Sequence, residues 1–295
     1  MNRIKHLWLE ITNRCNANCI FCGRQWALPP MDMTLEFFKS IIDQFKKPVK
    51  VQTQGFGEPL LHLDIVEMVK YANSKGHHTI FYTNGSLLTP ELSQQLLDAK
   101  LDRIIFSVDA CTKEQYEYFR RGLRWDTLLT NMIMFKRLRD KALGKSSKLN
   151  YAGVSHANST FITARMCETV ENKNAIPEIK RFWDRYVDVV TSAPEVDIPP
   201  PHELKITPHV NYKPMDCKFP YEYLSVKSNG DVVMCCRDWF HVYVIGNLHD
   251  KSVKEIWKDI PVNQIRSSYK SGKNIPYLCK ICKTARTPTR QDMLV

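Results

Sequence analysis

Short apolar, β-branched segments alternate with amphipathic segments of helical period along the first two-thirds of the chain. When each strand is followed by a helix, neighbouring strands pair in parallel and are joined by right-handed crossovers. Six such units predict an α/β fold, in which a parallel sheet curls into a partial (β/α)6 TIM-like barrel. The predicted strands cover residues 7–11, 49–54, 78–82, 103–108, 161–167 and 187–191.

The predicted helices lie between these strands and carry helix-end signals. Thr34 suits the N-cap of the first helix, Gly76 follows the second, and Pro90 suits the first turn of the third. The helices are expected at 34–45, 63–74, 90–99, 113–143 (two stretches) and 177–186.

Three prolines at 199–201 end this pattern, and a shorter stretch with several cysteines follows. We therefore predict two domains, a barrel over 1–198 and a small α+β cluster-binding module over 199–295. The sequence contains no run of about 18 apolar residues, so no membrane helix is predicted. Residues 1–6 do not resemble a secretory signal. A cytoplasmic protein is expected, in which the ten cysteines serve metal ligation rather than disulfides.

Polar residues gather toward the carboxyl ends of the predicted strands, where barrels of this kind bind ligands. Alternation in 161–167 places Thr163, Arg165 and Cys167 opposite an apolar face, and therefore toward the barrel interior. In the same way, Ser107 and Asp109 lie opposite Phe106 and Val108, and Gln52 and Gln54 lie opposite Val51. For each residue alone a solvent boundary explains the polarity equally well; together they favour a site.

Cys15, Cys19 and Cys22 form the sharpest local motif, in the loop after the first strand. Three thiolates cannot complete a four-coordinate structural zinc site by themselves. They can hold three irons of a [4Fe–4S] cluster and leave the fourth iron open to a ligand.

A second group of cysteines lies near the carboxyl end of the chain. Cys279 and Cys282 have the C-x-x-C spacing shared by zinc and iron–sulfur sites, and both metals stay open on spacing alone. Cys236 points away from Cys235 if the segment is extended, so it is not expected to be a ligand. The remaining thiols, Cys111 and Cys167, are expected to be small buried side chains.

The order of these motifs resembles that of radical S-adenosylmethionine (SAM) enzymes. The cysteine loop follows the first strand, a Gly-Phe-Gly-Glu-Pro turn at 55–59 the second, and a Thr-Asn-Gly turn at 83–85 the third. The resemblance implies that Cys15, Cys19 and Cys22 bind a [4Fe–4S] cluster whose open iron binds SAM. Phe56 departs from the doubled glycine usual in the family.

The same resemblance implies which residues contact SAM. The arginine expected at the SAM carboxylate maps to Arg120, with Arg121 as the alternative. Phe21 occupies the position of an aromatic ring near the adenine. The implied SAM contacts are Phe21, Gly57, Glu58, Asn84, Ser107 and Arg120.

The carboxyl-terminal stretch resembles the SPASM/twitch extensions of this family and lacks the central cysteine block of a full SPASM module. The resemblance implies one auxiliary [4Fe–4S] cluster and makes zinc a minor alternative. Its cysteine spacing is similar to that of radical SAM aminocyclitol dehydrogenases. The implied ligands are Cys217, Cys235, Cys279 and Cys282.

The resemblance implies reductive cleavage of SAM to a 5′-deoxyadenosyl radical, which abstracts a hydrogen atom from a substrate. An auxiliary cluster that accepts the electron left behind would make the net reaction an oxidation. Arg165 and Asp238 are candidates for substrate contact or proton transfer. For Asp238, a salt bridge within a hairpin is an equally good interpretation.

The substrate class rests on weaker signals. The single auxiliary cluster favours a small polar metabolite, of the sugar or aminocyclitol type. A peptide substrate is disfavoured because residues 1–5 leave no room for a leader-binding domain, and RNA stays open because the formal charge is +11. A non-catalytic zinc or nucleic-acid-binding protein is the alternative from another class. The positive charge also suits an acidic flavodoxin or ferredoxin as electron donor.

Overall fold

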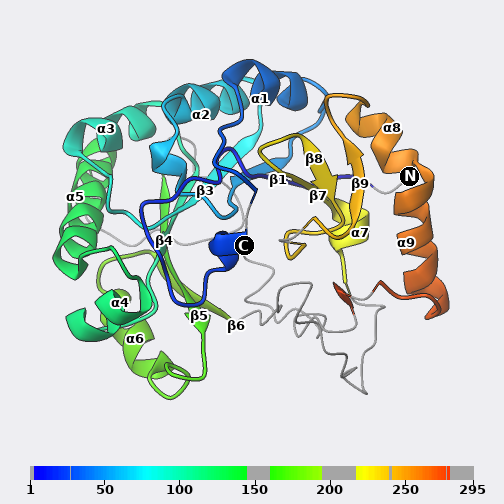
Figure 1. Ribbon diagram of the computed structural model, residues 1–295. Helices are drawn as coiled ribbons and strands as arrows, with labels where there is room; N and C mark the ends of the chain where they lie inside the picture. The colour runs from blue at the N-terminus through cyan, green and yellow to red at the C-terminus, as the bar shows by residue number, and fades with distance from the viewer. Residues whose placement is uncertain are drawn as a thin grey trace.

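The computed structural model of the protein describes residues 3–26, 28–144, 160–194, 217–238, 241–276 and 278–279. The strands in these ranges form one nine-stranded sheet in the order β6-β5-β4-β3-β2-β1-β7-β8-β9. The first six pair in parallel, and the helices form an outer arc around the sheet (Figure 1). The predicted α/β partial barrel is therefore confirmed.

The barrel elements follow the predicted order with small shifts at their ends. The first strand is shorter than predicted, because the chain leaves the sheet after Leu9 and Thr12 bridges Asp32 in antiparallel fashion. The strands are β1 (His6–Leu9), β2 (Lys50–Thr53), β3 (His78–Thr83), β4 (Arg103–Ser107), β5 (Phe161–Glu168) and β6 (Val189–Pro194). The helices are α1 (Leu35–Ile42), α2 (Ile65–Ser74), α3 (Pro90–Asp98), α4 (Lys113–Phe119), α5 (Trp125–Leu143) and α6 (Ile176–Trp183), with 3₁₀ turns η1 (Gly23–Trp26) and η2 (Pro59–Leu61).

The two faces of the sheet differ as the alternation predicted. Ile162, Ala164 and Met166 of β5 are buried in the core between sheet and helices. Thr163 lies on the other face, where it accepts a hydrogen bond from Arg103 Nε at 2.8 Å. The polar inner face is therefore the place to look for a ligand site.

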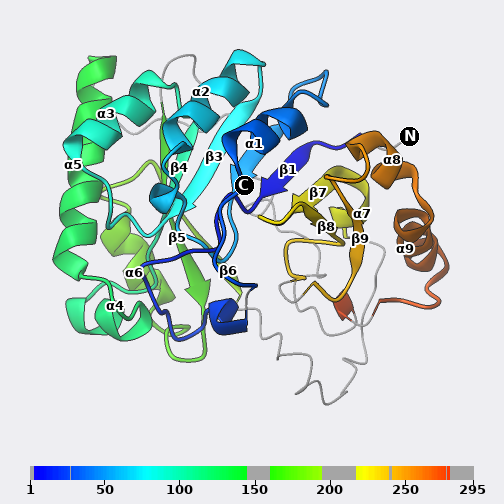
Figure 2. The ribbon, with the colours of Figure 1, turned by 45° about the horizontal axis from the view of Figure 1, so that its top comes forward.

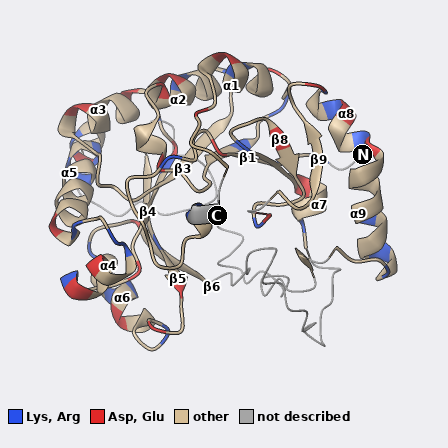
Figure 3. Ribbon diagram, viewed as in Figure 1, with Lys and Arg blue, Asp and Glu red and all other residues tan. Residues whose placement is uncertain are grey.

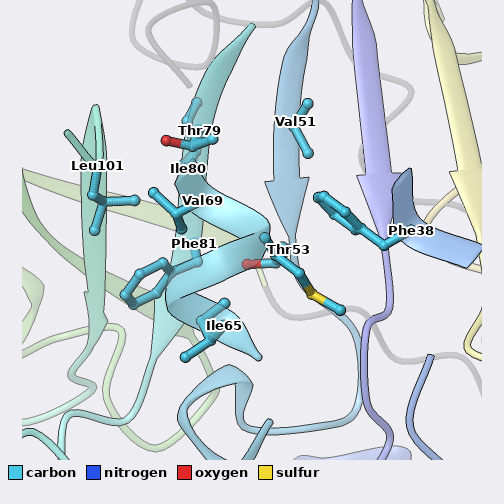
Figure 4. A pocket seen from close by; sticks show the side chains of 10 residues that line it. Phe38, Val51, Thr53, Ile65, Val69, Thr79, Ile80, Phe81 and Leu101 are labelled. Carbon is cyan, nitrogen blue, oxygen red and sulfur yellow. The ribbon is translucent and has the colours of Figure 1, made fainter. Parts of the chain in front are cut away.

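A small pocket lies on the outer face of the sheet, under α2 (Figure 4). Phe38, Val51, Ile65, Val69 and Phe81 are among the side chains that line it. Because its lining is almost wholly apolar, it is a packing gap in the core rather than a site for polar chemistry.

The carboxyl-terminal part extends the barrel sheet. β7 (Tyr223–Val226) pairs in parallel with β1, and β8 (Asp231–Val233) and β9 (Val244–Asn247) continue in antiparallel fashion (Figure 2). The sequence Ser-Asn-Gly-Asp at 228–231 predicts a turn that starts a hairpin strand, and this turn joins β7 to β8, with a φ of +86° at Gly230. The predicted boundary at 198/199 lies outside the described residues. The helices of this part are α7 (Phe219–Glu222), α8 (Val253–Lys258) and α9 (Ile260–Ser271).

This module also contacts the first barrel helix. The Val253 N–H donates to Gln44 Oε1 at 2.7 Å, and the His249 ring stacks on Phe37 with 3.9 Å between centroids. The module is thus held to the barrel both through the sheet and through α1. Among the helices of the described ranges, none is long and apolar enough to cross a membrane.

Candidate active site

The three cysteines of the first motif lie in one loop between β1 and η1. All are free thiols and half-buried. Burial raises the pKa of the Cys15 thiol to about 11, and the nearby Glu58, Cys19 and Cys22 charges add to this rise. Cys19 and Cys22 affect the pKa of Cys15 because the three thiols lie near one another. Bound iron would favour the thiolate form of each. Among the described residues no three metal-ligating side chains stand close enough together to hold a metal ion, so the fit to a cluster rests on the chemistry of three thiols in one loop.

The cysteine loop is fixed against the end of α4. The Asn18 N–H donates to the Arg121 carbonyl at 2.8 Å, and the Ile20 N–H donates to the Phe119 carbonyl at 3.0 Å. These two bonds place Arg120 directly beside the loop. Its Nη1 donates to Cys19 Sγ at 3.7 Å, and its guanidinium lies 5.6 Å from the Phe21 ring centroid.

Arg120 and Arg121 point to different surroundings. Arg120 is only 8% exposed and pairs with the buried Asp109, with 2.5 Å between Nη2 and Oδ2. Arg121 is exposed and lies over the Tyr118 ring at 6.0 Å. The structure therefore places the side chain of Arg120, and not that of Arg121, beside the cysteine loop.

The turn at 55–59 packs directly against the start of the cysteine loop. A Cβ at Gly57 would lie 2.1 Å from the Thr12 carbonyl oxygen, so only glycine fits. The Glu58 N–H donates to the Arg14 carbonyl at 2.8 Å. The turn and the cysteine loop therefore form one unit.

Glu58 and Asn84 are brought together at the carboxyl ends of β2 and β3. The Glu58 carboxylate accepts hydrogen bonds from Thr83 Oγ1 at 2.6 Å and from the Asn84 N–H at 2.7 Å. Asn84 Nδ2 donates in turn to Asn16 Oδ1 in the cysteine loop at 2.8 Å. Burial raises the pKa of Glu58 to about 7, against the opposing effect of these hydrogen bonds.

The inner face of the sheet also carries Ser107 and Arg165. Ser107 pairs in register with Arg165 of β5, and the Arg165 guanidinium lies 5.9 Å from the Tyr82 ring. Asp238 lies elsewhere, in the loop after β8. Its carboxylate accepts the N–H groups of Val242 and Tyr243, both at 2.8 Å, and forms no salt bridge with another described residue, so these two bonds replace the suggested hairpin salt bridge.

Sequence reasoning placed Gln52 on this inner face but missed its two neighbours, Trp8 and Ser225. Trp8 of β1 pairs in register with Gln52 of β2 on one side and with Ser225 of β7 on the other. Trp8 Nε1, Gln52 Oε1 and Ser225 Oγ are buried and have no hydrogen-bond partner among the described residues. Buried polar atoms normally have partners, so this row is suited to a polar ligand. Ser225 could not be found, since only the β1–β7 pairing brings it here.

The carboxyl-terminal cysteines gather beside the end of β8. Burial raises the pKa of Cys235, and the Cys236, Cys279 and Cys217 thiols add to this effect. Tyr269 Oη and Cys279 Sγ are 2.8 Å apart. Cys236 also interacts electrostatically with Tyr82 and Tyr223 on the inner face of the sheet. Cys282, the fourth implied ligand, lies outside the described residues.

Comparison with known proteins gives two family matches. Residues 9–156 match the model of the Radical SAM superfamily, and residues 217–283 match SPASM, an iron–sulfur cluster-binding domain. The crystal structure of BtrN in complex with AdoMet and 2-DOIA has a TM-score of 0.62 and 18% identity, covering 100% of this chain and 99% of BtrN. At that identity the similarity concerns the fold.

Two curated relatives are similar in sequence. A Pyrococcus furiosus tungsten-containing aldehyde ferredoxin oxidoreductase cofactor-modifying protein is 25% identical over 301 residues, covering 86% of this chain and 81% of that protein. The AdoMet-dependent heme synthase of Methanosarcina barkeri is 33% identical over 116 residues, covering 38% of this chain and 33% of the synthase. These relatives have different activities, so similarity to them does not identify a substrate.

Proposed function

The chain belongs to the radical SAM superfamily, and we propose that it oxidises a small polar metabolite of the sugar or aminocyclitol type. Its radical SAM domain implies a [4Fe–4S] cluster and SAM, and its SPASM domain implies auxiliary iron–sulfur clusters. When bound, these groups supply reductive cleavage of SAM to a 5′-deoxyadenosyl radical, hydrogen abstraction from the substrate and an acceptor for one electron.

The SAM end of the site is assigned to residues that converge on the cysteine loop. Cys15, Cys19 and Cys22 hold the first cluster. Arg120 is directed at the loop by Asp109 and is suited to a carboxylate. Glu58 offers carboxylate oxygens toward an amino group, held in place by Thr83 and Asn84. We assign Gly57 of the same turn to the amino group of SAM, Phe21 to the adenine and Ser107 to the ribose.

The substrate class rests on one observation, the unpaired polar row of Trp8, Gln52 and Ser225 on the inner face. A donor, an acceptor and a hydroxyl in one row suit a ligand with several hydroxyl or amino groups. Arg165 lies on the same face and is assigned to substrate contact or proton transfer. Asp238 stays a weaker candidate for the same role, because its carboxylate already accepts two backbone hydrogen bonds.

The atoms and electrons of the proposed oxidation balance. The substrate would lose one hydrogen atom to the 5′-deoxyadenosyl radical that bound SAM would supply, one electron to the auxiliary cluster if present, and one proton to a base. We assign Cys217, Cys235, Cys279 and Cys282 to that cluster; four thiolates leave it no open iron, which suits electron transfer. A flavodoxin or ferredoxin in the cytoplasm would supply the electron that cleaves SAM.

Peptide maturation and RNA modification are the alternative activities. In Figure 3 basic and acidic residues lie side by side on most of the outer helices, but α9 carries Arg266 and Lys270 and no acidic residue, so RNA stays an alternative substrate. An RNA substrate would show itself as a salt-sensitive gel shift that persists without SAM. A non-catalytic zinc protein would contain zinc in place of iron.

The proposal is tested with oxygen-free reconstituted protein. Two clusters predict about eight iron atoms per chain. With dithionite and SAM, the intact chain should form 5′-deoxyadenosine, and the Cys15→Ala/Cys19→Ala/Cys22→Ala variant should form none. Deuterated sugars and aminocyclitols, a peptide and an RNA are then compared for transfer of deuterium into 5′-deoxyadenosine. Equal product from intact and triple-variant protein contradicts the enzyme assignment; transfer from peptide or RNA alone contradicts the substrate class.

A further inference from the structure

Glu10 and Lys227 form a buried charged pair at the junction of the two parts of the chain. Lys227 Nζ lies 3.6 Å from Glu10 Oε2, and the two residues are 6% and 5% exposed. Glu10 directly follows β1, and Lys227 directly follows β7, the neighbouring strand from the SPASM part. Burying two charges costs free energy unless further contacts satisfy them. The other contacts of Glu10 and Lys227 therefore show what stabilises the buried pair.

Both members of the pair contact Phe56. The Phe56 N–H donates a hydrogen bond to Glu10 Oε2 at 3.0 Å, and Lys227 Nζ lies 5.4 Å from the centre of the Phe56 ring. The carboxylate therefore fixes the backbone of Phe56, and the ammonium group lies over its ring. Phe56 is itself only 8% exposed.

The neighbouring glycine shows how closely Glu10 approaches this turn. A Cβ at Gly55 would lie 2.4 Å from Glu10 Oε2. On the other side of Phe56, Gly57 packs on the Thr12 carbonyl and the Glu58 N–H donates to Arg14. The turn at 55–59 is therefore held from both sides, and Lys227 is the contribution of the SPASM part.

We propose that Glu10 and Lys227 position the 55–59 turn for SAM binding, so that the SPASM part of the chain sets the affinity for SAM. This inference rests on the proposed contact of Gly57 and Glu58 with SAM. Lys227 acts through Phe56 and is a positioning residue. The phenylalanine at 56, where the family usually has glycine, thereby has a structural explanation, because its ring gives Lys227 a surface to contact.

The test compares Lys227→Met with Lys227→Arg, and uses Lys251→Met as the matched control. Lys251 lies in the same part of the chain, is 51% exposed and pairs with Asp259 at the surface. SAM is titrated into each reduced, reconstituted protein and binding is read from the change in the cluster's EPR spectrum. Lys227→Met should weaken SAM binding and raise KM for SAM about tenfold, a typical size for coupling between sites. The kcat at saturating SAM and the iron content should stay unchanged.

Two variants not yet named, Phe56→Leu and Glu58→Gln, keep the inference falsifiable. Lys227→Arg should restore most of the affinity, and Lys251→Met should match the intact chain. Phe56→Leu keeps the backbone bond to Glu10 but removes the ring, so it should weaken SAM binding even if Lys227→Met does not fold. Normal SAM binding in both Lys227→Met and Phe56→Leu, with weak binding in Glu58→Gln, would overturn the positioning role. Normal binding in Glu58→Gln as well would show that the turn does not contact SAM.

Discussion

Asp109 holds Arg120 in place beside the cysteine loop. The carboxylate is fully buried, pairs with Arg120 Nη2 at 2.5 Å and accepts the Cys167 N–H at 2.7 Å. Burial raises the pKa of Asp109, and the positive charge of Arg120 opposes that effect. The pair fixes the direction of the guanidinium before any ligand arrives, which lowers the entropy lost on binding.

Replacing Arg120 by Met should affect both stability and SAM binding. The change leaves the Asp109 carboxylate buried and unpaired, which costs about 3–5 kcal/mol of stability for buried pairs in general. Denaturant unfolding and SAM titration of the reconstituted protein measure the two effects. Arg121→Met is the matched control, since Arg121 is exposed, and should change neither. A larger loss of SAM affinity in Arg121→Met than in Arg120→Met would reverse the mapping.

The barrel could be predicted from sequence because its signals are local. Periodicity, the Thr34 cap and the turn at 228–231 each depend on a few neighbouring residues, and each is present in the structure. The pairing of β7 with β1 joins residues more than two hundred positions apart and leaves no local signal. The sequence therefore predicted the cysteine loop and the turns but missed Ser225 and the Glu10–Lys227 pair.

Glu58 should make SAM binding depend on pH near neutrality. Its pKa is raised from 4.5 to about 7, mainly by burial. The ionised carboxylate is the better partner for an amino group, so SAM affinity should increase as the pH rises through about 7. Glu58→Gln should bind SAM more weakly and lose this dependence. An affinity profile that is the same in both proteins between pH 6 and 8 would exclude this role.

The same group has the opposite effect on the stability of the protein without SAM. The folded protein keeps the proton on Glu58 up to a pH of about 7, while the unfolded carboxyl group loses it near 4.5. The folded state therefore binds more protons in this window, and the contribution of Glu58 to stability falls as the pH rises. The free energy of unfolding is measured for the intact protein and for Glu58→Gln at pH 5 and at pH 7. The difference between the two proteins should be smaller or of opposite sign at pH 7, because the contribution of Glu58 falls as the pH rises.

Cys279→Ser should remove the auxiliary cluster and spare the first. Cys279 is 5% exposed and lies beside Tyr269 and the other carboxyl-terminal thiols. About half of the iron should be lost, while SAM cleavage continues in part, because Cys15, Cys19 and Cys22 are unchanged. Cys111→Ser, outside both groups, should keep all of its iron. Full iron content in Cys279→Ser would remove this residue from the ligand set.

Asp238→Asn separates a role in the loop from a role in the reaction. The carboxylate accepts the Val242 and Tyr243 N–H groups, and hydrogen bonds to charged groups contribute about 1.5–3 kcal/mol each. If Asp238 only closes the loop, stability should fall while turnover below the unfolding temperature stays near that of the intact chain. A loss of turnover without a loss of stability would assign it to the reaction.

Ser225→Ala should stabilise the protein and impair its reaction, a combination that only a ligand-facing hydroxyl explains. Ser225 is 4% exposed and its Oγ has no partner among the described residues. Removing a buried, unsatisfied hydroxyl should therefore raise the free energy of unfolding by about 1 kcal/mol. Ser93→Ala is the matched control, because Ser93 is equally buried but its Oγ donates to the Thr89 carbonyl at 2.7 Å. That variant should lose about 1 kcal/mol. Equal destabilisation of the two variants would show that the Ser225 hydroxyl is satisfied within the protein, and would remove it from the substrate site.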